Sequence, residues 1–201
     1  MLGIGSVVIA YLLGSIPFGY IIVRLKTGSD IRASGSGNIG ATNVLRTTGR
    51  AAGVLTLMLD FAKGFAAVWL ASWLTGGEAA WAALAAVAVL LGHGYPVFLG
   101  FKGGKAVAST LGAFLFLTPS AIAAVTVVFV VAVAMTRYIS LGSILAAGLF
   151  PLAVWLIAHP PFPVIYASVF AGVFIVYRHV DNIRRLHEGT ERVLSLKGRK
   201  R

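Results

Sequence analysis

Long apolar runs separated by short polar segments dominate the chain. Five runs are long enough to cross the roughly 30 Å hydrocarbon layer of a bilayer: residues 2–23, 51–74, 79–99, 139–158 and 160–177. Residues 103–136 would form a helix of about 51 Å at 1.5 Å per residue, which is longer than the bilayer is thick. Thr118, Pro119 and Ser120 interrupt this stretch. The pattern therefore predicts two short spans there, and seven membrane-spanning helices in a single all-α bundle.

The basic residues support the count of seven. With seven spans, the Lys and Arg residues of segments 24–50, 102–105, 137 and 178–201 fall on one side of the membrane, and Lys63 lies inside the second span. A six-span arrangement would scatter these charges over both faces. Because basic loops stay in the cytoplasm, we predict an N-terminus outside, a C-terminus in the cytoplasm, and short or re-entrant polar segments at the cytoplasmic face.

Composition agrees with an integral membrane protein. Of 201 residues, 58% are hydrophobic, 11% are charged and none is cysteine, which excludes disulfides and thiolate chemistry. The net charge of +11 lies at the ends of apolar runs, so we attribute it to topology and an anionic ligand rather than to nucleic acid. The N-terminus lacks the basic region of a signal peptide, which predicts a retained first span. We expect one membrane domain, residues 1–192, and a basic tail, residues 193–201. Nothing implies an oligomer, and a monomer is compatible with the sequence.

The first polar island is the segment GSGNIGATNVLRTTGR, residues 35–50. Glycines permit positive φ and allow backbone N–H groups to face one anion, while hydroxyl, amide and guanidinium groups add donors. These residues are Gly35, Ser36, Gly37, Asn38, Gly40, Thr42, Asn43, Arg46, Gly49 and Arg50. Arg46 and Arg50 are four positions apart, the spacing of one helical face. The island predicts a phosphate site; a flexible polar loop is the alternative.

A second island, residues 92–109, contains Gly103, Gly104 and Lys105 at the start of the predicted fourth span. Backbone donors and a lysine at a helix N-terminus form an anion site. The spacing does not match a nucleotide-binding P-loop, because Leu99 stands where the first glycine is required. His93, at the end of the third span, is more typical of a hydrogen-bonded packing residue than of a ligand.

A third island follows the last span, where His179, Asn182 and Arg185 recur at a spacing of three and share a helical face. Ser143, at the start of the sixth span, is a further candidate, although hydroxyls there commonly cap helices. Asp60 and Lys63 lie inside the second span and are expected to neutralise each other. No His, Asp or Glu cluster has metal-ligand spacing, so we predict neither metal nor cofactor.

Together the motifs GSGNIGATNVLRTTGR, LDFAKG, HGYPVFLGFKGGKAVAS and HVDNIRRLHEGTE resemble those of the PlsY family, the bacterial acyl-phosphate:glycerol-3-phosphate acyltransferases. The resemblance covers essentially the whole chain. It implies transfer of a fatty acyl group from acyl phosphate to the 1-hydroxyl of glycerol 3-phosphate, which gives lysophosphatidic acid and phosphate. It also implies a multi-pass protein of the bacterial cytoplasmic (inner) membrane, with membrane lipid around it and the active site facing the cytoplasm.

The resemblance further implies site residues. Those expected to bind acyl phosphate are Gly35, Ser36, Gly37, Asn38, Gly40, Thr42, Gly103 and Gly104. Those expected to bind glycerol 3-phosphate are Arg46, Arg50, Lys105, Ser143, His179 and Asn182. The residues expected to act in catalysis are Ser36, Asn38, Lys105 and His179.

Acyl phosphate carries a good leaving group, so charge neutralisation and placement of the hydroxyl are the main requirements. We therefore expect direct attack by the glycerol hydroxyl, with either His179 or the substrate's own phosphate accepting the proton. A Ser36 nucleophile is less favoured, because no histidine or carboxylate is placed in sequence to activate it. Two other classes remain as alternatives: a transporter of a phosphorylated metabolite, and a CDP-alcohol phosphotransferase, which would need a cluster of aspartates.

Overall fold

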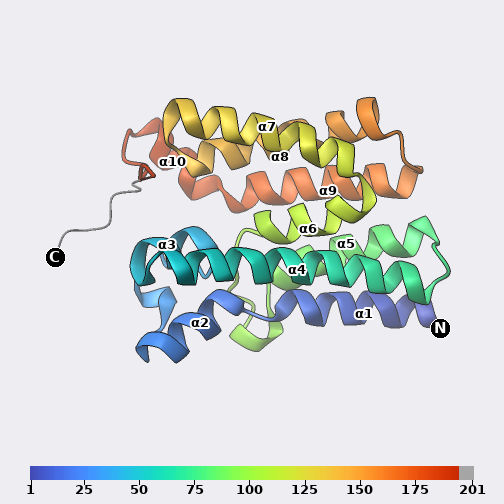
Figure 1. Ribbon diagram of the computed structural model, residues 1–201, viewed down its shortest axis with the longest axis horizontal. Coiled ribbons are helices and arrows are strands. Elements are labelled where there is room, and N and C mark those ends of the chain that lie inside the picture. The colour runs from blue at the N-terminus through green and yellow to red at the C-terminus, as the bar shows by residue number, and fades with distance from the viewer. Residues whose placement is uncertain (195–201) are drawn as a thin grey trace.

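The computed structural model describes residues 1–194, in which every regular element is a helix, and most of the long helices run along a common direction (Figure 1). The elements are α1 (Leu2–Ser15), α2 (Phe18–Thr27), η1 (Ile31–Ala33), α3 (Ala41–Thr48), α4 (Arg50–Leu74), α5 (Ala79–Gly94), η2 (Val97–Leu99), α6 (Val107–Leu117), α7 (Pro119–Thr136), α8 (Ile139–Ala153), η3 (Val154–Ala158), α9 (Phe162–Arg178) and α10 (Val180–His187). The predicted basic tail lies outside the described residues, apart from its first two positions.

The predicted division of residues 103–136 is confirmed. α6 ends at Leu117, α7 begins at Pro119, and the chain reverses direction between them (Figure 1). Pro119 occupies the first turn of α7, where a missing N–H costs no helical hydrogen bond. Five segments of the described chain are long and apolar enough to cross a membrane, and the bent pair α9 and α10 makes a sixth. α6, with 11 residues, is about 17 Å long and follows an irregular segment, residues 100–106.

The first predicted span is broken in the middle. α1 ends at Ser15 and α2 starts at Phe18, because Pro17 cannot donate a backbone hydrogen bond. Lys63 on α4 donates a hydrogen bond of 2.8 Å to the Ile16 carbonyl at this break. Its Nζ atom also lies 2.7 Å from Oδ1 of Asp60. The expected pairing of the two charges inside the bundle is confirmed, and the lysine adds a second hydrogen bond to the Ile16 carbonyl, which also accepts from the Phe18 amide at 3.2 Å.

Small residues bring the helices into close contact, as the composition predicts for packing in lipid. α4 and α6 meet where a Cβ atom on Gly64 would lie 2.1 Å from the Ser109 carbonyl oxygen, and one on Gly112 would lie 2.0 Å from that of Phe61. Alanines fill much of the rest of the buried core. The interhelical distance is therefore set by backbone contact, which fixes the elements that carry the polar site.

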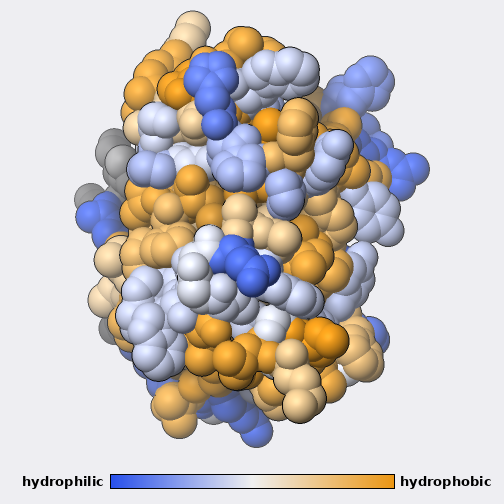
Figure 2. Space-filling view, turned by 90° about the vertical axis from the view of Figure 1, so that its right-hand side faces the viewer, coloured by the Kyte–Doolittle hydropathy of each residue, from blue (hydrophilic) through white to orange (hydrophobic). Residues whose placement is uncertain are grey.

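The two ends of the bundle differ in character. α2, α3 and α10 gather at the left-hand end of Figure 1, opposite the N-terminus. Figure 2 looks onto the N-terminal end, where hydrophobic surface predominates and strongly hydrophilic residues are few. The charged and titratable residues of the loops on this side are Glu78 and His159. The polar islands of the sequence thus meet at one end.

Candidate functional site

A cavity of about 960 Å³ opens among the polar segments and the helices that follow them. Most of the predicted site residues line it: Ser36, Gly37, Asn38, Gly40, Thr42, Arg46, Gly103, Lys105, Ser143, His179 and Asn182. Gly35, Arg50 and Gly104 do not contribute to its wall. The structure therefore brings together residues from the three polar islands and Ser143 of α8, four segments that are far apart in the chain.

Asn43 organises the glycine-rich loop, residues 34–40, which precedes α3. Its Oδ1 atom accepts a hydrogen bond of 2.9 Å from the Ser36 amide, and its Nδ2 atom donates to the carbonyls of Ser34 and Asn38 at 3.0 and 2.8 Å. The side chain is almost fully buried. A Cβ atom on Gly35, where φ is +63°, would lie 2.1 Å from Asn43 Oδ1. Glycine is therefore required here for space as well as for conformation.

The expectation that the backbone N–H groups of this loop face one anion is wrong for most of them. The Ser36 amide is bonded to Asn43, the Gly37 amide to the Ser34 carbonyl, and the Gly40 amide to Oδ1 of Asn38. Gly40 has φ of −77°, a value open to any residue. The loop uses these amides to hold its own shape, and it presents the N-terminus of α3 to the cavity through Gly40, Ala41 and Thr42.

Arg50 does not share a helical face with Arg46, which corrects the sequence expectation. Gly49, with φ of +108°, ends α3 and turns the chain into α4. The exposed Arg50 consequently starts a different helix and lies outside the cavity wall. Four-residue spacing predicts a shared face only where no glycine breaks the helix.

The pair Gly103 and Gly104 also differs from expectation. Their amides donate to the carbonyls of Gly94 and His93 at 3.2 and 3.0 Å, so neither amide points to an anion. Their carbonyls accept hydrogen bonds from Arg178 at 2.9 and 3.1 Å. α6 begins only at Val107, so Lys105 extends from an irregular segment rather than from a helix start. The two glycines therefore position Lys105 and do not donate hydrogen bonds to a bound anion.

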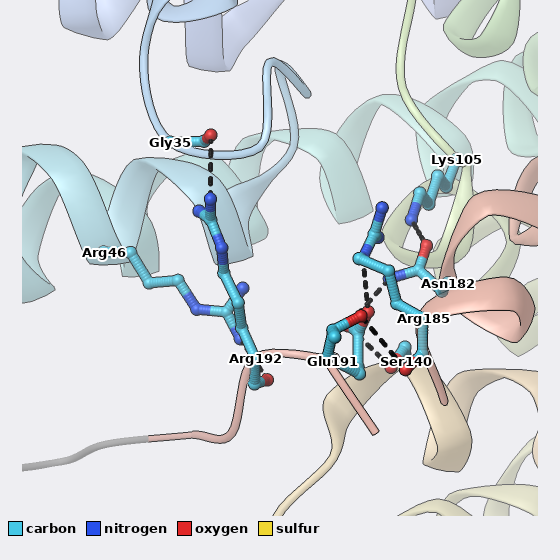
Figure 3. A network of polar contacts seen from close by, with 9 residues as sticks. Gly35, Arg46, Lys105, Ser140, Asn182, Arg185, Glu191 and Arg192 are labelled. Atoms are coloured by element: carbon cyan, nitrogen blue, oxygen red, sulfur yellow. Dashed lines mark hydrogen bonds and ion pairs between the residues drawn. The ribbon is translucent and has the colours of Figure 1, made fainter. Parts of the chain in front are cut away.

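A hydrogen-bonded network joins the second and third islands (Figure 3). The Lys105 ammonium donates to Oδ1 of Asn182, whose Nδ2 atom donates to Glu191 at 2.8 Å. Ser140 donates to the same carboxylate at 3.0 Å, and Arg185 pairs with it at 2.8 Å. The Glu191 carboxylate therefore fixes the amide orientation of Asn182, so that its oxygen faces the lysine.

Arg46 lies on the opposite side of the polar cavity. It donates a hydrogen bond of 3.0 Å to the carbonyl of Arg192, and the Arg192 guanidinium donates to the Gly35 carbonyl at 3.2 Å (Figure 3). The segment that follows α10 is also held at Leu194, whose amide donates to the Arg137 carbonyl at 2.7 Å. This segment consequently links α8 and α10 to the glycine-rich loop across the site.

Burial and neighbouring charge shift the ionisation of these groups. Burial, with a smaller contribution from the Arg185 charge, lowers the pKa of Lys105 to about 8. Burial likewise lowers the pKa of Arg46, although the Glu191 charge opposes the shift. For Glu191, burial would raise the pKa, but hydrogen bonds from Arg185, Asn182 and Ser140 outweigh it and the pKa is lowered. The side chains of the site thus carry more positive charge than negative, and a bound anion would relieve the repulsion.

His179 stands between α9 and α10 in a neutral state. Burial, and then the Lys105 charge, lower its pKa to about 4. Its Nδ1 atom lies 2.8 Å from the Ile175 carbonyl oxygen. Because a carbonyl only accepts, the proton is on Nδ1 and the lone pair is on Nε2. His179 can therefore accept a hydrogen bond from a substrate hydroxyl.

The remainder of the cavity wall is apolar. Side chains from α4, α6, α7 and α8 form it, among them Leu57, Leu111, Phe129 and Phe150. Val54 on α4 and Val130 on α7 line the cavity and are also more than half exposed, at 53% and 55%. The cavity thus combines a cationic end with apolar walls that reach the lipid-facing surface between α4 and α7.

Several residues that shape the site are missing from the expected substrate-binding and catalytic residues. They are Asn43, the organiser of the loop, and Arg178, Ser140, Arg185, Glu191 and Arg192. Of these, Asn43 and Arg185 are among the polar residues singled out in the islands, without a specific role. Glu191 is one of six acidic residues in the chain and the last residue of the motif HVDNIRRLHEGTE, but neither fact indicates which side chains it contacts. Among residues 1–194, no group of three or more His, Cys, Asp or Glu side chains could hold a metal ion. The absence of a metal cofactor from the reaction stays a prediction.

The fold and the site define an integral membrane protein with a cavity that combines a cationic end with apolar walls. The glycerol-3-phosphate acyltransferase family model matches residues 4–189. The chain is 50% identical over 183 residues to a glycerol-3-phosphate acyltransferase of Geobacter sulfurreducens, covering 91% of this chain and 93% of the relative. It is 48% identical to that of Syntrophotalea carbinolica over 90% and 92% of the two chains.

Two crystal structures of PlsY (YgiH), an integral membrane glycerol 3-phosphate acyltransferase, have the same fold. The glycerol 3-phosphate form superposes with a TM-score of 0.91 at 42% identity and 96% coverage of each chain. The lysophosphatidic acid form gives 0.87 at 40% identity, with 96% and 95% coverage. This chain belongs to the glycerol-3-phosphate acyltransferase family.

Proposed function

We propose that this protein transfers a fatty acyl group from acyl phosphate to the 1-hydroxyl of glycerol 3-phosphate, giving lysophosphatidic acid and inorganic phosphate. The single observation that carries the proposal is the continuous cavity, which joins a cationic end to apolar walls. Glycerol 3-phosphate has a phosphate but no hydrocarbon chain, whereas acyl phosphate and lysophosphatidic acid each have both. The donor named in the family resemblance therefore fits the shape and the polarity of the cavity.

In the proposed complex, glycerol 3-phosphate lies between Arg46 and Lys105, with His179 and Asn182 completing its site. Arg46 and Lys105 come from opposite sides of the polar end (Figure 3), so a dianion between them would neutralise two cations at once. Ser143 donates its hydroxyl to the Ile139 carbonyl at 2.9 Å, which leaves its oxygen able to accept a hydrogen bond from a substrate hydroxyl.

The acyl phosphate headgroup is proposed to lie at the N-terminus of α3, beside Ser36, Asn38 and Thr42. A helix N-terminus favours anions, and the acyl chain would extend along the apolar wall. The glycines of both islands then act by shaping the backbone rather than by donating hydrogen bonds to the substrate. They are Gly35, Gly37, Gly40, Gly103 and Gly104.

The reaction proposed is a single acyl transfer. The oxygen of the 1-hydroxyl attacks the acyl carbonyl carbon, the bond from that carbon to the phosphate oxygen breaks, and the phosphate leaves as its dianion. Positioned cations stabilise the charge on both phosphates. Nδ1 of His93 pairs with Ser109 at 3.0 Å and Nδ1 of His179 faces the Ile175 carbonyl, so neither of these two nitrogens can serve Ser36 as a base.

The proton of the 1-hydroxyl is proposed to reach a phosphate oxygen of glycerol 3-phosphate and then to pass to the departing phosphate, which leaves as the hydrogen phosphate dianion. Nε2 of His179 is proposed to accept a hydrogen bond from the other glycerol hydroxyl and so to orient the substrate. A group with a pKa of about 4 is a weak base at neutral pH, whereas the second ionisation of a phosphate monoester lies near pH 6. The value of kcat/KM should accordingly decrease as the pH is lowered through about 6. A limb near pH 4 that disappears in His179→Asn would assign the proton to the histidine instead.

The membrane arrangement proposed is seven crossings, with the cavity and the C-terminus facing the cytoplasm of a bacterial inner membrane. α9 and the short α6 supply the two crossings beyond the five long segments. Support for the orientation comes from the basic residues, which lie toward the end that carries α2, α3 and α10. Reaction of single cysteines placed at Gly28 and Gly76 with an impermeant thiol reagent in intact cells tests it, because only the second should react.

The test of the activity uses purified protein with acyl phosphate in detergent or vesicles. Phosphate should be released only when glycerol 3-phosphate is present, in equal amount to the lysophosphatidic acid formed. Release without glycerol 3-phosphate, or transport of glycerol 3-phosphate without acylation, would contradict the proposal. The polar groups gather at one end of the bundle, which disfavours the transporter alternative, since a transport path needs polar groups through the bilayer.

A further inference from the structure

Lys105 stands on an irregular segment, so something other than a helix must fix its position. Residues 100–106 lie between η2 and α6, and Phe101 and Ala106 both adopt positive φ. A chain segment of this kind has no internal ladder of hydrogen bonds, and its polar groups need partners elsewhere. Those partners are found at Gly103 and Gly104, directly before the lysine.

The two glycines are held from both sides. On one side their amides donate to the last carbonyls of α5, those of Gly94 and His93. On the other side the guanidinium of Arg178 donates from Nη2 to the Gly103 carbonyl at 2.9 Å and from Nε to the Gly104 carbonyl at 3.1 Å. The backbone of both residues is therefore fixed before the chain reaches Lys105.

Arg178 is itself held in place. Its guanidinium carbon lies 5.1 Å from the centre of the Tyr95 ring, a cation–π geometry. Tyr95 packs edge-on against Phe174 of α9, with ring centres 6.0 Å apart. The planar fork of an arginine can bond two neighbouring carbonyls at once, whereas a lysine ammonium is a single point charge.

We propose that Arg178 is a positioning residue of this enzyme, whose guanidinium clamps the carbonyls of Gly103 and Gly104 and thereby sets Lys105 against Asn182. His179 directly follows Arg178 and Asn182 lies four positions after it, so one short segment carries both the clamp and two residues of the anion site. The inference rests on the proposed function only in taking Lys105 as a substrate-binding residue. The clamp itself is a statement about geometry.

The first test measures how readily Lys105 is acetylated in the absence of substrate. Full-length protein in detergent at neutral pH is treated briefly with acetic anhydride, and acetylation of Lys105 is followed by mass spectrometry relative to the exposed Lys26. In Arg178→Gln and Arg178→Lys the acetylation rate of Lys105 should rise about tenfold. The reason is that both variants lose the charge-assisted hydrogen bonds from Arg178 to the carbonyls of Gly103 and Gly104, which fix the backbone before the lysine. An unchanged rate in both variants would overturn the clamp.

The second test separates the clamp from the charge. Arg178→Lys keeps the positive charge and loses the fork, so kcat/KM should fall about ten- to a hundredfold in both variants. Near-normal activity in Arg178→Lys would assign Arg178 an electrostatic role and refute the proposal. The matched control is Arg184→Gln, because Arg184 lies on α10 with an 80% exposed side chain; it should stay within twofold of the native enzyme in both tests.

Arg178→Gly adds a rescue experiment. Millimolar guanidinium should restore part of the activity and slow the acetylation of Lys105, whereas ammonium at the same concentration should do neither. Rescue by both cations would indicate charge alone. If the native protein lacked acyltransferase activity, the acetylation rates would still decide on the clamp, so the two failures are distinguishable.

Discussion

Lys105 donates a hydrogen bond to Oδ1 of Asn182, a residue 77 positions further along the chain. The contact joins the irregular segment before α6 to the short helix α10, and Glu191 orients the amide from behind. Both residues line the cavity. Contacts within the protein therefore hold the pair in place, which keeps low the cost of ordering the site when substrate binds.

This contact predicts coupling between the two residues. Lys105→Ala and Asn182→Ala should each lower kcat/KM about ten- to a hundredfold, because each removes a charge-assisted contact worth about 1.5 to 3 kcal/mol. The double variant should lose clearly less than the product of the two single losses, since the residues act as one unit. Steady-state kinetics of all four proteins gives the answer, and simple multiplication of the two effects would show that the residues act independently.

The lowered pKa of Lys105 predicts an alkaline limit. Anion binding needs the charged ammonium, which is present below a pKa of about 8 and is lost as the pH rises through it. The value of kcat/KM, which reports the free enzyme, should therefore fall about tenfold for each pH unit well above 8. In Lys105→Arg, which stays charged, the residual activity should show no such limb. A limb that stays unmoved in this variant would point to another group.

The buried pair of Asp60 and Lys63 predicts an asymmetric stability effect. Lys63→Met leaves the carboxylate buried without its partner and should destabilise the protein by about 3 to 5 kcal/mol. The double variant Asp60→Asn with Lys63→Met should recover much of this loss, although the Ile16 carbonyl loses its hydrogen bond from Lys63 and keeps only the one from the Phe18 amide. Thermal unfolding in detergent compares the three proteins, and equal stability of the single and double variants would contradict the argument.

Two glycines with similar backbone angles predict different outcomes. Gly35 has φ of +63° and Gly28 has φ of +70°, but a Cβ atom would meet Asn43 Oδ1 at 2.1 Å at the first and nothing within 4 Å at the second. Alanine should cost about 1 to 2 kcal/mol in stability at either site for the positive φ. Only Gly35→Ala should also lower activity, by about tenfold or more, because it displaces the loop beside Ser36. Similar activity in the two variants would show that the contact with Asn43 is unimportant.

The sequence by itself determined the class of protein and the positions of its long apolar segments. Periodicity, the length of apolar runs and the placement of Lys and Arg depend on local composition, so the break at Thr118 and Pro119 follows from the chain alone. The same holds for the three polar islands, because residue types such as those at Ser36, Lys105 and His179 are uncommon in a bundle that is otherwise apolar.

Tertiary structure decided which groups face the cavity. Gly49 separates Arg50 from Arg46, and the amides of Gly103 and Gly104 are bonded to α5, which no spacing rule reveals. Glu191 gains its role through Asn182, Arg185 and Ser140, contacts that exist only once α8 and α10 lie side by side. Sequence patterns report which groups need partners, but only the packing of distant segments selects those partners, because a hydrogen bond depends on distance and direction in space.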